Sequence, residues 1–260
     1  LLDAGRLQDA AVAVEAVKAS GNTGSAGAHW RIAAGLVTWG NGDLAGAREN
    51  FEAADTLAHS AANGSLAALP VAFNAGIYLS EGNAVYAVKL LREALPTLSA
   101  SGDLDHYAYF NGIYGRALIQ SGHEGEGAAY IGKALELADH LQDKLRIRQW
   151  SLDLGERAFR EGRFFDAQNH QQRALKLFDE SQHAPEYVNA LCAAARTHLA
   201  IHNLDIARDL ANKALGAAQQ GDDASALVSA QGVLGSALRA SGQTADGLPY
   251  LQAAAAAPET

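Results

Sequence analysis

Small residues recur along this chain at a fixed interval of 40 residues, and this period constrains the fold more than any other feature. Gly5 stands 37 residues before the first of the evenly spaced positions. Those positions hold Gly in every case but one: Gly42, Gly82, Gly122, Gly162, His202 and Gly242. A period between about 20 and 50 residues is the signature of a repeat architecture. We therefore expect an array of similar units, not one deep globular core.

Two further positions of the repeat are small in every unit. Five residues after each reference position stand Ala10, Ala47, Ala87, Gly127, Ala167, Ala207 and Gly247. Seven residues before it stand Gly35, Ala75, Gly115, Gly155, Ala195 and Gly235. Because several offsets agree at once, the repeat is not an accident of an Ala-rich and Gly-rich composition. Small side chains at fixed positions indicate surfaces where neighbouring helices approach closely.

Each unit is predicted to be two helices joined by a short turn at the reference position. Gly readily takes the backbone conformations that end a helix, and apolar residues such as Ile131 and Leu135 follow helical spacing. Pro70 and Pro185 fall where first helices should begin, in the turn that tolerates proline. The sequence thus predicts an all-α fold, an α-solenoid of antiparallel helical hairpins.

The chain resembles the tetratricopeptide repeat (TPR) family, which has a small residue late in the first helix, Gly at the turn and two Ala in the second helix. Residues that carry the resemblance are Gly155, Gly162, Ala167 and Ala174, and also Gly35, Gly42, Ala47, Phe51 and Ala54. The usual unit is about 34 residues long. A 40-residue unit therefore implies the extended variant found in signalling adaptors and in sensor modules of bacterial regulators.

The resemblance covers residues 1–260 and implies one TPR-like superhelical array. Residues 1–20 are predicted to be the second helix of a truncated unit, because Gly5 has no first helix before it. The absence of Met also favours an excised portion of a longer polypeptide. Six complete hairpins are expected at about 24–61, 65–100, 103–141, 143–181, 184–220 and 223–257.

The family resemblance also implies that first helices line a concave groove. Polar residues at the exposed inner positions concentrate in the third to fifth complete hairpins: Tyr109, Arg116, Gln149, Glu156, Arg160, Asn189 and Arg196. These side chain types suit recognition of an extended peptide. The alternative is that they form the solvated face of a plain scaffold, since any amphipathic helix needs a polar face.

The segment from Lys144 to Lys176 has a local charge of +4, in a chain whose net charge is −9. One interpretation is a docking surface for an acidic partner segment. The other is internal pairing, because Arg157 and Glu161 are four residues apart on a helix. Similarly, His198 and His202 have the spacing of a shared metal site, but no third ligand can be assigned, which favours a structural or surface role.

Several function classes are disfavoured by composition. The net charge of −9 and the pI near 5.4 argue against a nucleic-acid partner. No apolar run is long enough to insert in a membrane. The single Cys192 suggests a reducing compartment, hence a cytoplasmic location. No phosphate loop, nucleophile elbow or dinucleotide fingerprint is present, so we expect no cofactor, no metal and no catalysis.

The sequence thus predicts a non-catalytic scaffold that binds a protein or peptide segment. The first alternative is a ligand-sensing or peptide-sensing regulatory domain of a larger bacterial signalling or transcription protein. The second is an enzyme built as an α/α toroid, which would require carboxylates gathered at one end of a closed ring. The oligomeric state stays open.

Overall fold

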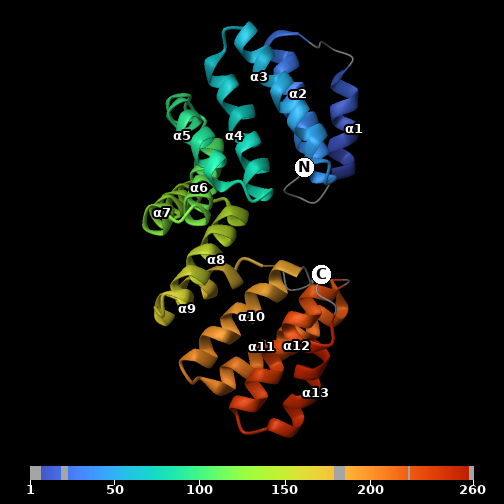
Figure 1. Cartoon of the computed structure of the whole chain (residues 1–260), viewed down its shortest axis with the longest axis vertical. Helices are drawn as coiled ribbons and strands as arrows, with labels where there is room; N and C mark the ends of the chain where they lie inside the picture. The colour runs from blue at the N-terminus through green and yellow to red at the C-terminus, as the bar shows by residue number, and fades with distance from the viewer. Residues whose placement is uncertain (1–6, 19–22, 179–184, 222, 258–260) are drawn as a thin grey trace. The chain divides into compact units, whose positions relative to one another are not determined.

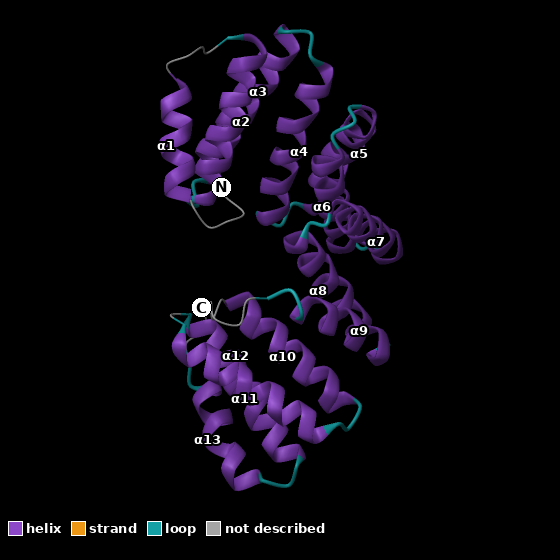
Figure 2. Ribbon diagram, turned by 180° about the vertical axis from the view of Figure 1, so that it is seen from behind, coloured by secondary structure: helices purple, strands orange, loops and turns teal. Residues whose placement is uncertain are grey.

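The computed structural model describes residues 7–18, 23–178, 185–221 and 223–257, and within these ranges the chain is helical without a strand (Figure 1, Figure 2). Gly5 and the ends of the expected hairpins near 181 and 184 lie outside the described residues. The chain divides into two compact units, Leu1–Asp143 and Lys144–Thr260. A single array through both units stays a prediction.

Unit 1 stacks three hairpins in chain order after an additional helix, α1, at its start. α1 packs on α2, where the indole Nε1 of Trp30 donates a hydrogen bond to the carbonyl of Val14 at 2.9 Å. Neighbouring first helices also contact one another within the unit. The helices are α1 (Leu7–Lys18), α2 (Gly24–Gly40), α3 (Leu44–Ser60), α4 (Gly64–Ser80), α5 (Ala84–Ala100), α6 (Leu104–Gln120) and α7 (Glu124–Leu141).

Unit 2 repeats the same scheme with three further hairpins. α8 pairs with α9, α10 with α11 and α12 with α13, while α9 and α11 each contact the first helix of the next hairpin. The helices are α8 (Lys144–Arg160), α9 (Phe164–Leu175), α10 (Pro185–Ala200), α11 (Leu204–Gln220), α12 (Ala224–Ala240) and α13 (Thr244–Ala255).

Helix ends follow a 20-residue step, half of the sequence period. A residue with positive φ ends the helix both within hairpins and between them: Gly42, Ala62, Gly82, Gly102, Gly122, Gln142, Gly162, His202 and Gly242. Gly reaches this left-handed region without strain, whereas a side chain carries a cost there. The turns between hairpins at Ala62 and Gln142 therefore have the same backbone geometry as the glycine turns, without the glycine.

Side chains at the start of the next helix reinforce this step. Five residues accept a hydrogen bond from the backbone N–H three positions later: Asp43, Asn63, Asn83, Asp103 and Asp223. Such an N-cap contributes about 1 kcal/mol to helix stability. Short turns and frequent caps explain why most helices have the same length of 17 residues.

The core combines buried alanines with a few large side chains. Ala47, Ala87, Ala167 and Ala207, five residues after the turn, are wholly buried. In unit 1 the rings of Phe51, Phe73 and Phe110 form one column through α3, α4 and α6, with centroids 5.3 and 5.0 Å apart. This column links the three hairpins of the unit through contacts of the kind that stabilise aromatic cores.

One prediction about proline was wrong. Pro70 lies inside α4, six residues after its first residue, and not in the first turn. A proline there cannot donate to the carbonyl of Leu66. Pro70 is buried on α4, as are Phe73 and Ile77, so it contributes to the apolar face of the helix. Pro185, by contrast, is the first residue of α10, as expected.

Candidate functional site

The residues predicted to line a groove lie on first helices of both units. Tyr109 and Arg116 lie on α6 of unit 1, and both side chains are partly exposed. They are seven residues apart and therefore share one face of the helix. The ring of Tyr109 packs edge-on against Phe110, with centroids 5.1 Å apart, which fixes its direction on α6.

In unit 2 the structure brings two of the predicted residues together. Nη2 of Arg196 on α10 lies 3.6 Å from Oε2 of Glu156 on α8, and the two side chains are 46% and 48% exposed. Both residues occupy the same position of their repeats, six before the turn. The 40-residue period thus places equivalent positions of successive first helices side by side.

The other three predicted residues of unit 2 lie on the same two helices. Asn189 is exposed on α10, Arg160 is exposed at the end of α8, and Gln149 is partly buried. The Glu156–Arg196 pair therefore provides a direct contact between α8 and α10 within the predicted strip.

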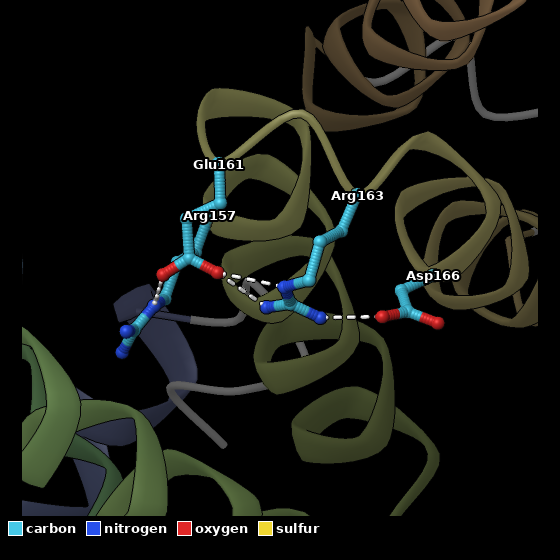
Figure 3. A network of polar contacts seen from close by, with 4 residues as sticks. All are labelled: Arg157, Glu161, Arg163 and Asp166. Atoms are coloured by element: carbon cyan, nitrogen blue, oxygen red, sulfur yellow. Dashed lines mark hydrogen bonds and ion pairs between the residues drawn. The ribbon is translucent and has the colours of Figure 1, made fainter.

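Two cations of the basic stretch of unit 2, Arg157 and Arg163, are engaged in internal ion pairs (Figure 3). Glu161 accepts from Nε of Arg157 at 2.6 Å and from Nη2 of Arg163 at 2.6 Å, and Nη1 of Arg163 reaches Asp166 at 2.5 Å. Hydrogen bonds from the two arginines lower the pKa of Glu161. The network crosses the turn between α8 and α9, so these cations stabilise the hairpin.

The paired histidines have different surroundings. His198 is buried in α10, where desolvation lowers the pKa of its imidazole, and its Nδ1 lies 3.5 Å from Nδ2 of Asn203. His202 occupies the turn with a φ of 60°. Across the described ranges, no three His, Cys, Asp or Glu side chains gather where they could hold a metal ion. In the same ranges no helix is both long and apolar enough to cross a membrane.

The opposite face of α6 carries side chains that the sequence analysis did not single out. Tyr107, Asn111 and Tyr114 are spaced by four and three residues and therefore share one face of the helix. They line a pocket between α5, α6 and α7. The spacing was visible in the sequence, but it is also the spacing of an ordinary core face, so it could not identify a pocket.

Comparison with known proteins gives matches in structure alone. No protein-family model matches the chain, and no curated protein sequence matches it. Among solved structures, BtubC (BKLC) from P. vanneervenii superposes with a TM-score of 0.69 at 18% identity, covering 83% of this chain and 89% of that one.

Two other solved structures superpose over most of the chain. A Rap protein complexed with Competence and Sporulation Factor gives a TM-score of 0.66 at 15% identity, covering 93% of this chain and 75% of its own. The Cut9 and Hcn1 hetero-tetramer of APC/C superposes with a TM-score of 0.74 at 15% identity, covering 98% of this chain and 44% of that one. The fold is therefore a TPR-type α-solenoid.

Proposed function

We propose that unit 2 binds an extended segment of a protein through the exposed face of α8 and α10, without catalysing a reaction. The observation that carries the proposal is the pair formed by Glu156 and Arg196, which joins neighbouring first helices while staying about half exposed. Asn189 and Arg160 are exposed on the same helices and supply further hydrogen-bonding groups. Tyr109 and Arg116 on α6 are the corresponding proposal for unit 1.

The pair keeps hydrogen-bonding capacity for a ligand. A direct charge-assisted hydrogen bond measures about 2.7–2.9 Å, whereas Arg196 and Glu156 are 3.6 Å apart. An arginine has five N–H donors, and a carboxylate has about four acceptor positions. A peptide backbone in an extended conformation offers alternating carbonyl and N–H groups that match this pairing of donor and acceptor.

Solved structures with the same fold support a binding role. The Rap structure contains Competence and Sporulation Factor, and the Cut9 structure is a complex with Hcn1. The net charge of −9 supports a protein partner over a nucleic acid. Arg157 and Arg163 are already paired with Glu161, so these two side chains are less available to an acidic partner.

The test is a selection of linear peptides from a displayed random library, followed by titration of the selected peptides as synthetic compounds. Arg196→Ala and Asn189→Ala should each weaken binding by tenfold or more. Arg208→Ala is the matched control, because Arg208 is a partly exposed arginine on the second helix α11, paired with Asp205 at 3.2 Å. Equal affinities for all three variants and the unchanged chain would place the binding surface elsewhere.

A sensing role is the second candidate, and the specific observation in its favour is the likeness to structures described as sensors. The apo form of the quorum sensor NprR superposes with a TM-score of 0.62 at 12% identity. If this chain senses a ligand, the selected peptide should change hydrogen exchange far from α8 and α10 within unit 2. Protection confined to those two helices would indicate a scaffold without a sensing response.

A further inference from the structure

A pocket of about 360 Å³ lies in unit 1 between α5, α6 and α7. Its volume is within the range of pockets that hold small molecules, about 300–1,000 Å³. Tyr107 and Tyr114 project from the face of α6 opposite to Tyr109, because residues two and five positions apart point to opposite sides of a helix. The pocket is therefore separate from the surface proposed above, and a negative result for one of the two proposals does not contradict the other.

Two cations stand at the pocket, each held by a tyrosine of α6. Nζ of Lys133 on α7 donates to the phenol oxygen of Tyr107 at 2.5 Å and lies 4.7 Å from the centre of that ring. Nε of Arg92 on α5 donates to the phenol oxygen of Tyr114 at 3.4 Å. A lysine has three N–H donors and an arginine has five, so each cation keeps donors that a bound anion can use.

The electrostatics of the pocket favour negative charge. None of the described lining residues is a carboxylate, and two are cations, in a chain of net charge −9. Glu126 on α7 is near enough to interact with Arg92, but it does not line the pocket. Burial alone would raise the pKa of Tyr107, yet hydrogen bonds from Lys133 and Ser99 outweigh it and lower the value.

The walls of the pocket are suited to a planar ring. The rings of Tyr114 and Tyr130 meet edge to face, with centroids 4.7 Å apart and an interplanar angle of 80°. Leu95 and Pro96 on α5 complete the apolar part of the lining. Aromatic ligands pack favourably against such edges and faces, and the exposed rim at Arg92 and Lys133 leaves a path for entry.

Asn111, one of the residues that line the pocket, has a buried acceptor without a donor. Asn111 is wholly buried, its Nδ2 donates to the carbonyl of Tyr107 at 2.6 Å, and its Oδ1 has no hydrogen-bond partner within the described part of the chain. A buried polar atom left unpaired costs about 1–3 kcal/mol. A ligand that brings an O–H or N–H to this oxygen would remove that cost, once the side chains that cover Asn111 move aside.

We propose that this pocket binds a small aromatic carboxylate that also carries a hydrogen-bond donor. The carboxylate lies between Arg92 and Lys133, the ring packs against Tyr114 and Tyr130, and the donor reaches Oδ1 of Asn111. The charge of the rim, the aromatic walls and the unpaired amide oxygen each account for one part of that chemistry.

The test is calorimetric titration of the whole chain with 4-hydroxybenzoate. 4-Hydroxybenzamide has the same ring and hydroxyl without the charge, and it should bind at least tenfold more weakly. Benzoate lacks the donor and should bind several-fold more weakly. Titration with inorganic phosphate tests whether the pocket binds any small anion without regard to its ring. Failure of 4-hydroxybenzoate to bind at millimolar concentration, or phosphate binding equally well, would overturn the proposal.

Variants locate the binding. Lys133→Gln and Arg92→Gln should each weaken the binding of 4-hydroxybenzoate by about tenfold. Asn111→Leu should remove the preference for 4-hydroxybenzoate over benzoate. Lys89→Gln is the control, since Lys89 is an exposed cation of α5 outside the pocket lining. Thermal melts identify any variant that fails to fold. An intact Lys133→Gln or Arg92→Gln chain with unchanged affinity would show that the ligand binds elsewhere.

Discussion

Gly115 on α6 and Gly127 on α7 lie directly against each other's backbone. A Cβ atom added to Gly115 would lie 2.6 Å from the carbonyl oxygen of Gly127, and one added to Gly127 would lie 2.5 Å from that of Gly115. Both distances are shorter than a carbon and an oxygen tolerate. The two helices of this hairpin are therefore as close as they are because neither residue has a side chain.

Replacing either glycine of this pair should destabilise unit 1. Gly115→Ala and Gly127→Ala force the backbones apart, and overpacking of this kind costs about 1–3 kcal/mol. Gly132→Ala is the matched control on α7, because a Cβ there has no atom within 4 Å, and it should stabilise the helix by about 0.4–1 kcal/mol. Urea unfolding measures all three. Equal stability of the three variants would contradict the close approach.

The turns within hairpins could be predicted because glycine marks them. Gly42 and Gly122 adopt a φ of 85° and 90°, a conformation for which glycine is the usual residue. The turns between hairpins at Ala62 and Gln142 have the same conformation without that residue, so local sequence could not reveal the 20-residue step. Caps such as Asn63 indicate a helix start but also suit loops.

The candidate sites were predictable to different degrees. Glu156 and Arg196 follow from the period, because equivalent positions of adjacent repeats must lie near each other once the helices stack. Tyr107 and Asn111 could not be recognised from the sequence, since the pocket depends on the distance between α5 and α7. That distance is a property of packing, and no single residue encodes it.

Ala167 tests the small position of the second helix. It is wholly buried, and its carbonyl lies 3.5 Å from the position of a Cβ on Gly155. Ala167→Leu should lower the free energy of unfolding of unit 2 by about 1–3 kcal/mol. Asn169→Leu, an exposed position of α9, should change it by less than about 0.5 kcal/mol. A denaturant series that gave the reverse order would refute the packing role of Ala167.

The turn at His202 offers a stabilising substitution. His202 has a φ of 60°, in the region where a side chain costs roughly 1–2 kcal/mol. His202→Gly relieves that cost but increases the entropy of the unfolded chain, so a net gain of about 0.5–1 kcal/mol is expected. The reciprocal Gly162→His should be destabilising. Calorimetric melting temperatures check the pair, and a loss of stability in His202→Gly would show that the imidazole makes a compensating contact.

Stability should decrease in mild acid because two histidines are partly or fully removed from water in the folded chain. Burial lowers the pKa of His198 and His170 in the folded chain, so the unfolded chain takes up protons first as the pH falls. Their contribution is intact above the unfolded pKa of about 6.5 and decreases progressively below it. His198→Gln should flatten the profile of unfolding free energy between neutral pH and pH 5. The double variant with His170→Gln should flatten it further, and an unchanged slope would exclude both residues.

Cys192 should be nearly inert in the folded chain. Its side chain is 1% exposed, and burial raises the pKa of the thiol to about 11, despite the opposing charge of Arg196. The thiolate is the reactive form, so a disulfide reagent at pH 8 should label the native chain far more slowly than the chain in urea. Rapid labelling of both states would mean that α10 opens often.

First and second helices alternate along the chain every 20 residues, so a deletion of 20 residues and a deletion of 40 residues have different consequences. Removing 40 residues from turn to turn within unit 1, for example from Gly42 to Gly82, would join two equivalent positions and return the later helices of that unit to the same role. Removing only 20 residues would join turns of equal geometry, but each later first helix would then take the place of a second helix. Faces that are now exposed would be buried, and faces made of small residues would be exposed. Chains of this kind can therefore change length by whole hairpins, and single-helix changes should be lost through misfolding.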